Sequence, residues 1–381
     1  MTWSTLAPPA DIGFGVYVHV PFCHHKCDYC AFATFTDRAH LIDRYLEALH
    51  TEITRAARGE PAAPASTGPL PRASTIFVGG GTPSLVDASK LARVLDAIPR
   101  KPDAEFTIEC NPDDVTLAML TTYRSIGVNR ISLGMQSASP HVLKSLGRTH
   151  SPDNVARAVD AINAAGFGTF NLDVIYGGAG ESLADWSSTI EQVVALGAPH
   201  VSAYGLTVEA GTALAEQPAR HPDDDDQADK YDLADDLLIA AGFANYEISN
   251  WSKPGHECRH NAVYWSGGDY AGFGSAAHAH RNGRRWWNVR TPDRFVELIE
   301  AGRPAESSSE SLDDATRALE RLQLQLRTRD GVPVSALDST DVDEMSDLVQ
   351  RVSRGSFGDR LVLTRAGRLL ANEVSLRLLV A

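Results

Sequence analysis

Six short apolar runs, each followed by a longer amphipathic stretch, dominate the first half of this 381-residue chain. The runs are rich in β-branched and aromatic residues, which is typical of buried strands. We expect strands at Val16–Val20, Thr75–Val78, Glu105–Cys110, Arg130–Leu133, Thr169–Ile175 and His200–Tyr204, separated by helices at 41–58, 88–98, 116–126, 152–165 and 183–196. This alternation predicts a parallel sheet of the α/β class. Six units are fewer than the eight of a closed barrel, so we expect an incomplete (β/α)6 TIM-like barrel, or an open parallel sheet curled in that way.

The pattern changes near residue 312, where Leu319, Leu322 and Leu326 recur at helical spacing. Two more helix-like stretches follow, with a strand-like run at 360–364 between them. A chain of this length with 43% hydrophobic residues can bury one large core and a smaller second one. We therefore predict a core domain at 13–250, a linking segment at 251–311 and a small, mainly helical C-terminal domain at 312–381.

Charge and cysteine usage restrict the functional class. The formal net charge of −14 argues against a nucleic-acid partner, which would need a basic surface. Five cysteines, three of them clustered, do not form a disulfide framework. Residues 1–9 lack the features of a signal peptide, and no apolar run approaches eighteen residues, so we expect no membrane-spanning helix. These features predict a protein of the reducing cytoplasm.

Two conspicuous segments are given no functional role. Residues 59–72 are rich in Pro, Ala, Ser and Gly and are expected to form a mobile insertion. The run Asp223–Asp226 could suggest a metal site, but it precedes an amphipathic stretch at 228–241. Acidic residues at this position favour the positive end of a helix dipole, so we expect a solvated helix start.

Three cysteines with x3 and x2 spacing directly follow the first predicted strand: Cys23, Cys27 and Cys30. Three soft thiolates in eight residues are expected to converge on one metal centre. A structural zinc site needs a fourth ligand. Cys110 and Cys258 are each alone in the sequence. The histidines that could complete a Cys3His site are His19, His24 and His25. A four-iron cluster held by three cysteines would instead leave one iron open to a non-protein ligand, which is the stronger hypothesis.

Polar and glycine-rich groups follow the other predicted strands where each strand ends. They are found at 79–83, 109–112, 134–137, 171–173 and 176–178. Any one of them could be a helix cap or a satisfied buried polar group. Because the carboxyl ends of parallel strands lie at one edge, five such groups together predict a binding site there.

The cysteine loop, with aromatic Tyr29 before its third cysteine, resembles the signature of radical S-adenosylmethionine enzymes. The resemblance implies a 4Fe-4S cluster on Cys23, Cys27 and Cys30. In that family the open iron is chelated by the amino and carboxyl groups of S-adenosylmethionine, and reductive cleavage gives a 5'-deoxyadenosyl radical.

From about residue 13 to 375 the order of motifs is similar to the oxygen-independent coproporphyrinogen III oxidase group of that superfamily. The resemblance implies that Tyr17, Gly80 and Glu109 would hold the cluster-bound S-adenosylmethionine. It implies a neighbouring position, where that oxidase holds a second S-adenosylmethionine, lined by Tyr29, Gly81, Thr82, Gln136, Arg148 and Asp173. The C-terminal domain would then be winged-helix in outline, and its near-neutral charge makes DNA binding the weaker option.

Two departures from the oxidase match instead its heme chaperone subgroup, HemW. Phe32 stands where the oxidase has a fourth cysteine, and only about twenty residues precede Cys23. The run His260-Asn261-Ala262-Val263-Tyr264-Trp265 is similar to the H-N-x-x-Y-W motif of that subgroup and is followed by a glycine-rich turn at 267–274. His260 is either an axial heme ligand or a buried histidine beside two core aromatics.

The resemblance favours a cytoplasmic protein that binds heme and passes it to heme-accepting apo-proteins. It also implies an electron donor that reduces the cluster. Peripheral contact with membrane respiratory proteins is a further option. The first alternative is the oxidase itself, which decarboxylates coproporphyrinogen III propionates in porphyrin biosynthesis. The second is a zinc-bound scaffold without radical chemistry. No side chain is assigned a catalytic role.

Overall fold

The computed structural model describes residues 12–60, 69–337, 342, 345–354 and 358–379. Two segments considered above fall outside this range: the start of the chain at 1–9, and residues 61–68 of the insertion at 59–72. The expectation that residues 1–9 form no signal peptide and the expectation of a mobile insertion therefore stay predictions.

All six predicted strands are present and form one parallel array. They are β1 (Gly15–Val20), β2 (Ala73–Gly80), β3 (Arg100–Cys110), β4 (Arg130–Gln136), β5 (Thr169–Tyr176) and β6 (His200–Gly205). Each strand pairs in parallel with the next along the chain. The carboxyl ends of all six therefore meet at one edge, which we call the carboxyl rim.

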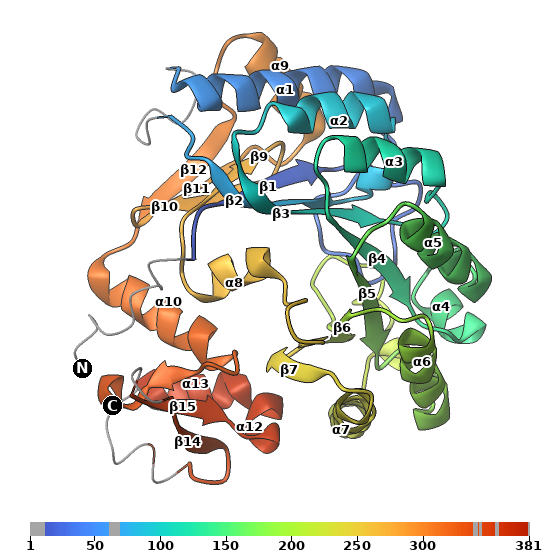
Figure 1. Cartoon of the computed structure of the whole chain (residues 1–381), viewed down its shortest axis with the longest axis vertical. Helices are drawn as coiled ribbons and strands as arrows, with labels where there is room; N and C mark the ends of the chain where they lie inside the picture. Colours follow the sequence, from blue (N-terminus) through green and yellow to red (C-terminus); the bar gives the residue numbers. More distant parts are fainter. Residues whose placement is uncertain (1–11, 61–68, 338–341, 343–344, 355–357, 380–381) are drawn as a thin grey trace.

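Helices connect these strands along the outer side of the curved sheet (Figure 1). They are α1 (Ile42–Arg58), α2 (Ala88–Asp96), α3 (Leu117–Ser125), α4 (Pro140–Ser145), α5 (Pro152–Ala164), α6 (Leu183–Ala195) and α7 (Asp224–Ala240). The five predicted helices are confirmed, whereas α4 is too short to show a periodicity. The expected helix start at Asp223–Asp226 is also confirmed, because the Asp223 side chain accepts a hydrogen bond from the Asp226 backbone N–H, 2.9 Å away.

The sheet extends beyond the six parallel strands at both edges. Next to β1 it adds β9 (Tyr270–Phe273), β10 (His278–Arg281), β11 (Arg284–Asn288) and β12 (Glu306–Ser311), and next to β6 it adds β8 (Asn250–Ser252) and β7 (Ala244–Glu247). Among these, β9 runs parallel to β1, and the other pairings are antiparallel. The described sheet is open, in the order β12-β11-β10-β9-β1-β2-β3-β4-β5-β6-β8-β7, which agrees with an incomplete barrel. Segment 251–311, expected as a link, contributes strands to the same sheet.

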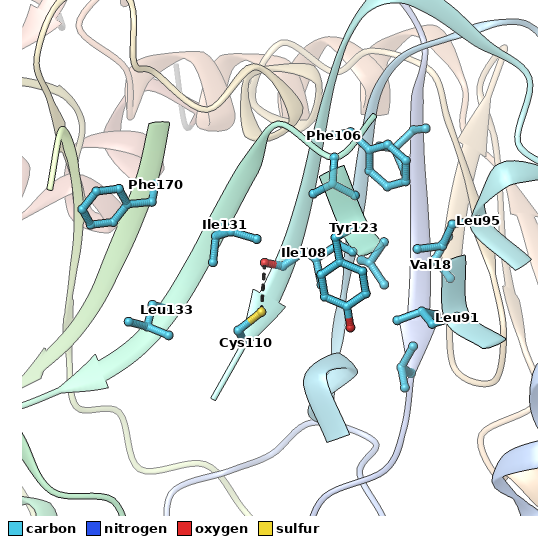
Figure 2. Close-up of a cluster of buried hydrophobic side chains, with 14 of the residues drawn as sticks. Val18, Leu91, Leu95, Phe106, Ile108, Cys110, Tyr123, Ile131, Leu133 and Phe170 are labelled. Atoms are coloured by element: carbon cyan, nitrogen blue, oxygen red, sulfur yellow. Dashed lines mark hydrogen bonds between the residues drawn. The ribbon is translucent and has the colours of Figure 1, made fainter. Parts of the chain in front are cut away.

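Alternate strand residues face the outer helices and form the main core. Figure 2 shows this layer, in which side chains of β1, β3, β4 and β5 meet those of α2 and α3. Its labelled members are Val18, Leu91, Leu95, Phe106, Ile108, Cys110, Tyr123, Ile131, Leu133 and Phe170. Burial of each large apolar side chain contributes about 1.5–3 kcal/mol. Since neighbouring strand residues point to opposite faces, polar residues such as Glu105 and Glu109 face the concave side.

The C-terminal part has a second core, with Leu322, Leu361 and Val374 among its members. Its elements are α10 (Asp314–Leu326), β13 (Val332–Pro333), β14 (Val349–Ser353), β15 (Asp359–Leu363), α12 (Arg365–Leu369) and α13 (Ala371–Leu379). The strands form a small antiparallel sheet in the order β13-β15-β14. The side chains of Arg365 and Arg368 both reach the buried Asp235 on α7 at 2.8 Å. This helical region therefore packs onto the main fold; the predicted domain boundaries stay predictions.

Candidate functional site

The loop that leaves β1 carries the three cysteines and is fixed by its own backbone. The Thr82 N–H donates to the Phe22 carbonyl at 2.8 Å, and the Cys23 N–H donates to the Phe35 carbonyl at 3.1 Å. The first bond attaches the loop to the end of β2, and the second closes it onto the returning chain. The loop is thereby held at the carboxyl rim.

Each cysteine sulfur has a polar side chain beside it. The Thr82 hydroxyl lies 3.5 Å from Cys23 Sγ, Arg148 Nη1 lies 3.6 Å from Cys27 Sγ, and the Thr34 hydroxyl lies 3.9 Å from Cys30 Sγ. Such donors stabilise the negative charge of metal-bound thiolates. In the absence of metal, burial raises the pKa of Cys23, and the two neighbouring thiols raise it further. Metal binding would overcome this by stabilising the thiolate form.

The histidines proposed as a fourth zinc ligand differ in their availability. His19 Nε2–H donates to the Ala33 carbonyl at 3.0 Å, and His19 Nδ1 is hydrogen-bonded to the Tyr17 hydroxyl at 3.0 Å. Burial lowers the pKa of His19 to about 4, so its ring is neutral and both nitrogens are engaged. His24 and His25 are exposed. Among the described residues, no group of three His, Cys, Asp or Glu side chains is close enough together to hold a single metal ion.

Three soft sulfurs on one loop are the donor type that iron-sulfur clusters use. The donor set of three soft sulfurs with polar neighbours fits a 4Fe-4S cluster with one open iron.

Three consecutive glycines at the end of β2 allow the backbone to pass beside the cysteine loop. A Cβ on Gly79 would lie 2.7 Å from Glu109 Oε2, and a Cβ on Gly81 would lie 2.6 Å from the Phe22 carbonyl oxygen. Gly80 has a φ of +112°, and a Cβ there would collide with the His19 ring. Gly80 and Gly81 admit no side chain without backbone strain or a backbone clash, which agrees with the expectation of a close backbone approach to a ligand.

Two carboxylates face the concave side near the rim. Desolvation raises the pKa of Glu109 to about 8, and the nearby Asp173 carboxylate raises it as well. Burial also raises the pKa of Asp173, but hydrogen bonds from Ser132 Oγ and Asn171 Nδ2, each 2.8 Å long, oppose the effect. A concave face with two such acids favours a cationic ligand with hydroxyl groups. S-adenosylmethionine carries an ammonium, a sulfonium and ribose hydroxyls.

Three further predicted residues lie around the same loop. Arg148 Nη2 donates to the Gly134 carbonyl at 3.3 Å, in addition to its contact with Cys27. Gln136 has a φ of 64°, a left-handed conformation that is uncommon for a residue other than glycine and often marks a functional site. Tyr29 belongs to the loop itself, and burial followed by the Cys27 thiol raises its pKa.

The structure thus brings twelve of the thirteen predicted site residues to the carboxyl half of the concave face and places His260 apart from them. His260 lies on α8 (Arg259–Trp265), which Figure 1 shows on the inner side of the sheet. It contacts Thr75, near the amino end of β2, with 3.0 Å between His260 Nδ1 and Thr75 Oγ1. Its Nε2 is hydrogen-bonded to the Tyr264 hydroxyl at 2.8 Å, and the side chain is fully buried. Burial lowers the pKa of His260 to about 3, which keeps the ring neutral.

Both ring nitrogens of His260 are therefore engaged, which is the buried-histidine alternative that the sequence left open. Iron ligation by His260 would require one of these hydrogen bonds to break. The proposed ligand role of this residue stays a prediction.

Sequence reasoning missed the residue that positions α8. The Glu105 carboxylate accepts hydrogen bonds from the backbone N–H groups of Arg259 and His260, each 2.9 Å long, and lies 3.7 Å from Cys258 Sγ. Its only sequence signal is a charged residue in an apolar strand, four residues before Glu109. Glu105 thereby fixes the H-N-x-x-Y-W segment to the amino half of the concave face.

Sequence and structure comparisons with known proteins agree with this geometry. Residues 17–193 match the Radical SAM superfamily. The chain is 42% identical to the heme chaperone HemW of Mycobacterium tuberculosis, covering 97% of this chain and 95% of that protein. It is 33% identical to the HemW of Bacillus subtilis, with 94% and 97% coverage.

Among solved structures, coproporphyrinogen III oxidase (HemN) from Escherichia coli, described as a Radical SAM enzyme, matches with a TM-score of 0.80. The alignment covers 99% of this chain and 92% of the oxidase at 21% identity, which shows a shared fold. The match confirms the predicted fold class, and the Radical SAM superfamily implies a 4Fe-4S cluster and S-adenosylmethionine as cofactors. From the cysteine loop, the carboxyl rim and the identity along nearly its whole length, this chain belongs to the HemW family of the Radical SAM superfamily.

Proposed function

We propose that this protein is a heme chaperone: it carries a 4Fe-4S cluster and S-adenosylmethionine at the carboxyl rim, binds heme, and transfers heme to apo-proteins. Two sequence relatives over nearly the whole length bear the heme chaperone name. The observation that carries the proposal is Phe32, which stands two residues after Cys30 with 69% of its surface exposed. A sulfur at this position is part of the oxidase pattern, whereas this chain presents an apolar ring to solvent.

Within this proposal Cys23, Cys27 and Cys30 hold the cluster, and Tyr17, Gly80 and Glu109 hold S-adenosylmethionine. When bound, the reduced cluster supplies an electron to S-adenosylmethionine. The Gly80 backbone N–H donates a hydrogen bond to the carboxylate of Glu109. In its ionised form this carboxylate would form an ion pair with a positively charged group of the cofactor.

The neighbouring position is assigned to Tyr29, Gly81, Thr82, Gln136, Arg148 and Asp173. Arg148 bridges this position and the cluster, since it contacts both Cys27 and the end of β4. A carboxylate-bearing ligand would suit its guanidinium.

The alternative is coproporphyrinogen III oxidation, which the presence of Gln136, Arg148 and Asp173 at the carboxyl half of β4 and β5 and beside Cys27 favours. Anaerobically reconstituted protein with a full cluster should be assayed for both activities in one preparation. We expect heme binding and transfer to a heme-free respiratory enzyme, with no conversion of coproporphyrinogen III. Decarboxylation without heme retention would overturn the chaperone function in favour of the oxidase.

Partners and compartment follow from the same function. Heme-accepting apo-proteins and an electron donor for the cluster are the proposed partners, and the cytoplasm is the proposed compartment. None of the described helices combines the length and apolarity needed to cross a bilayer. Contact with membrane respiratory proteins would then be peripheral. The net charge of −14 gives no support to a nucleic-acid partner.

A further inference from the structure

A cavity of about 750 Å³ lies beyond the amino half of the concave face, away from the cysteine loop. Its walls come from the segment before β1, the turn after α8, the turn between β10 and β11, and helix α10. A second cavity of about 180 Å³ shares Gly267, Gly268 and His280 with it and reaches Tyr264 and Tyr270. The larger volume falls within the range of small-molecule sites.

The larger cavity is cationic although the protein is acidic. Its charged lining consists of Arg72, Lys101, Arg281, Arg317 and Arg321, against Asp269. Arg321 forms no ion pair within the described part of the chain, and burial lowers its pKa. Arg317 pairs with Asp314 on its own helix. An excess of cationic side chains in a partly buried cavity, with the Arg321 guanidinium lacking an ion-pair partner among the described residues, favours an anionic ligand, carboxylates above all.

Two turns that contain glycine leave space for the side chains of Arg317 and Arg321 of α10 in this cavity. A Cβ on Gly267 would lie 2.7 Å from Arg321 Cγ, and a Cβ on Gly283 would lie 3.0 Å from Arg317 Nη1. Both glycines have positive φ angles, +68° and +79°. The glycine-rich turn after the H-N-x-x-Y-W segment therefore leaves room for Arg321.

His280 on β10 lines both cavities. Its Nδ1–H donates to the Gly268 carbonyl at 3.1 Å and lies 3.6 Å from the Asp269 carboxylate. Its Nε2 makes no hydrogen bond to another described residue. A histidine whose Nδ1–H is fixed by a carbonyl or carboxylate, with Nε2 remaining, has the arrangement of metal-ligating imidazoles.

Aromatic rings connect His280 to the H-N-x-x-Y-W segment. The ring of Tyr270 lies 6.3 Å from that of His280 and 4.7 Å from that of Tyr264, at 84° to the latter. Tyr264 is in turn hydrogen-bonded to His260. His260 thus fixes one tyrosine of an aromatic wall whose far end is His280.

We propose that the two adjoining cavities together form the heme site, with His280 Nε2 as the axial iron ligand, Tyr264 and Tyr270 of the smaller cavity against the porphyrin, and Arg317 and Arg321 paired with the two propionates. The proposal rests on the chaperone function and assigns its cargo to a place. Heme combines a flat aromatic ring, an iron that accepts imidazole and two carboxylates. The smaller cavity offers the tyrosines, and the residues shared by both cavities offer the imidazole and the guanidinium groups. His260 becomes a positioning residue that acts through Tyr264.

The test is a titration of the reconstituted full chain with ferric heme, recorded as difference spectra against the cluster absorption. We expect His280→Ala to weaken heme binding about tenfold or more and to shift the Soret band, because the axial ligand sets the electronic environment of the iron. His280→Met, which keeps the side-chain bulk and supplies a different ligand, should shift the band with cluster content unchanged. The matched control is His141→Ala, an exposed histidine on α4, which should bind like wild type.

Arginine variants test the propionate contacts. Arg317→Gln combined with Arg321→Gln should weaken heme binding but leave the affinity for heme dimethyl ester, whose propionates are uncharged, unchanged. The control is Arg294→Gln, an exposed arginine on helix α9 (Pro292–Glu300).

The outcomes separate this site from the chaperone function. Absence of heme binding by the wild-type protein would overturn both. Heme binding by wild type that survives His280→Ala and His280→Met with an unchanged Soret band would overturn this site alone. Loss of the axial band in His260→Ala, with His280→Ala retaining it, would assign the iron to His260 instead.

Discussion

The backbone N–H of Gly80 donates a hydrogen bond to the carboxylate of Glu109, 3.2 Å away, and joins the ends of β2 and β3 beside the cysteine loop. The same carboxylate occupies the space that a Cβ on Gly79 would need. One acid therefore determines both the glycine requirement and the charge of this part of the rim.

Binding of S-adenosylmethionine should depend on pH through Glu109. Because the pKa of Glu109 is raised to about 8, the group is mostly protonated at neutral pH and must release a proton to pair with a cation. We expect affinity to fall by up to about tenfold per pH unit below 8 and to level off above it. Glu109→Gln should bind more weakly with a flatter profile. Calorimetry in buffers of different ionisation enthalpy measures the proton release directly; equal heats in all buffers would contradict this role.

Cluster content should depend on three of the five cysteines. Reconstituted wild-type protein should hold about four irons per chain, and Cys23→Ala, Cys27→Ala or Cys30→Ala should each lose most of it. Cys110→Ala and Cys258→Ala are the matched controls, since Cys110 packs in the outer core (Figure 2) and Cys258 lies beside Glu105. Iron and sulfide analysis decides the matter. Loss of iron in a control, with a loop variant retaining it, would show that the ligands are assigned wrongly.

Gly81→Ala should disturb the cysteine loop. The added methyl group would lie 2.6 Å from the Phe22 carbonyl oxygen, so the loop must shift, at an expected cost of about 1–3 kcal/mol. We expect lower iron content after reconstitution and a lower Tm. Gly168→Ala is the control, because a Cβ there meets nothing within 4 Å. Equal iron content in the two variants would argue against the steric role of Gly81.

Buried neutral histidines should contribute a loss of stability in acid. Burial lowers the pKa of His19 to about 4 and that of His260 to about 3, below the ordinary 6.5. The stability that each neutral histidine contributes is fully present above pH 6.5, the ordinary pKa. It is lost as the pH falls from 6.5 towards the lowered pKa of the folded state. For His19 the total loss of unfolding free energy is about 3 kcal/mol. Glu52, whose pKa burial raises to about 7, acts in the opposite direction, with stability lost as the pH rises.

The histidine contribution is therefore best measured by difference. Denaturant unfolding at pH 7, 6, 5 and 4 should show a shallower loss in His19→Asn than in wild type, although that variant starts from a lower stability. Parallel curves for the two proteins would mean that His19 does not titrate on unfolding in this range.

Sequence alone was sufficient for the strands that carry the rim. Runs such as Val16–Val20 are buried on both faces or nearly so, and this gives an unbroken apolar signal. The edge strands gave no such signal. Glu306–Ser311 reads Glu-Ser-Ser-Ser-Glu-Ser and is mostly exposed, so its strand conformation comes from pairing with β11 rather than from burial.

Sequence patterns likewise predicted one of the two binding sites but not the other. The rim residues follow the ends of consecutive strands, so topology alone predicts that they meet. The cationic cavity joins residues from 12 to 321 that share no motif, and only the folded chain brings Arg321 next to Gly267. His260 matched a motif, yet its surroundings decided that both of its nitrogens are engaged.

The two parallel neighbours of β1 are made at very different times. β2 follows soon after β1, whereas Tyr270–Phe273 of β9 comes about 250 residues after Val20. At about 5–20 residues per second, a ribosome needs roughly 12–50 s to reach it. During that interval the strand that leads into the cysteine loop has one unpaired edge, where another chain could add. The pairing of β1 on both edges, and with it a stable seat for the iron-sulfur cluster, is therefore complete only after β9 has been made.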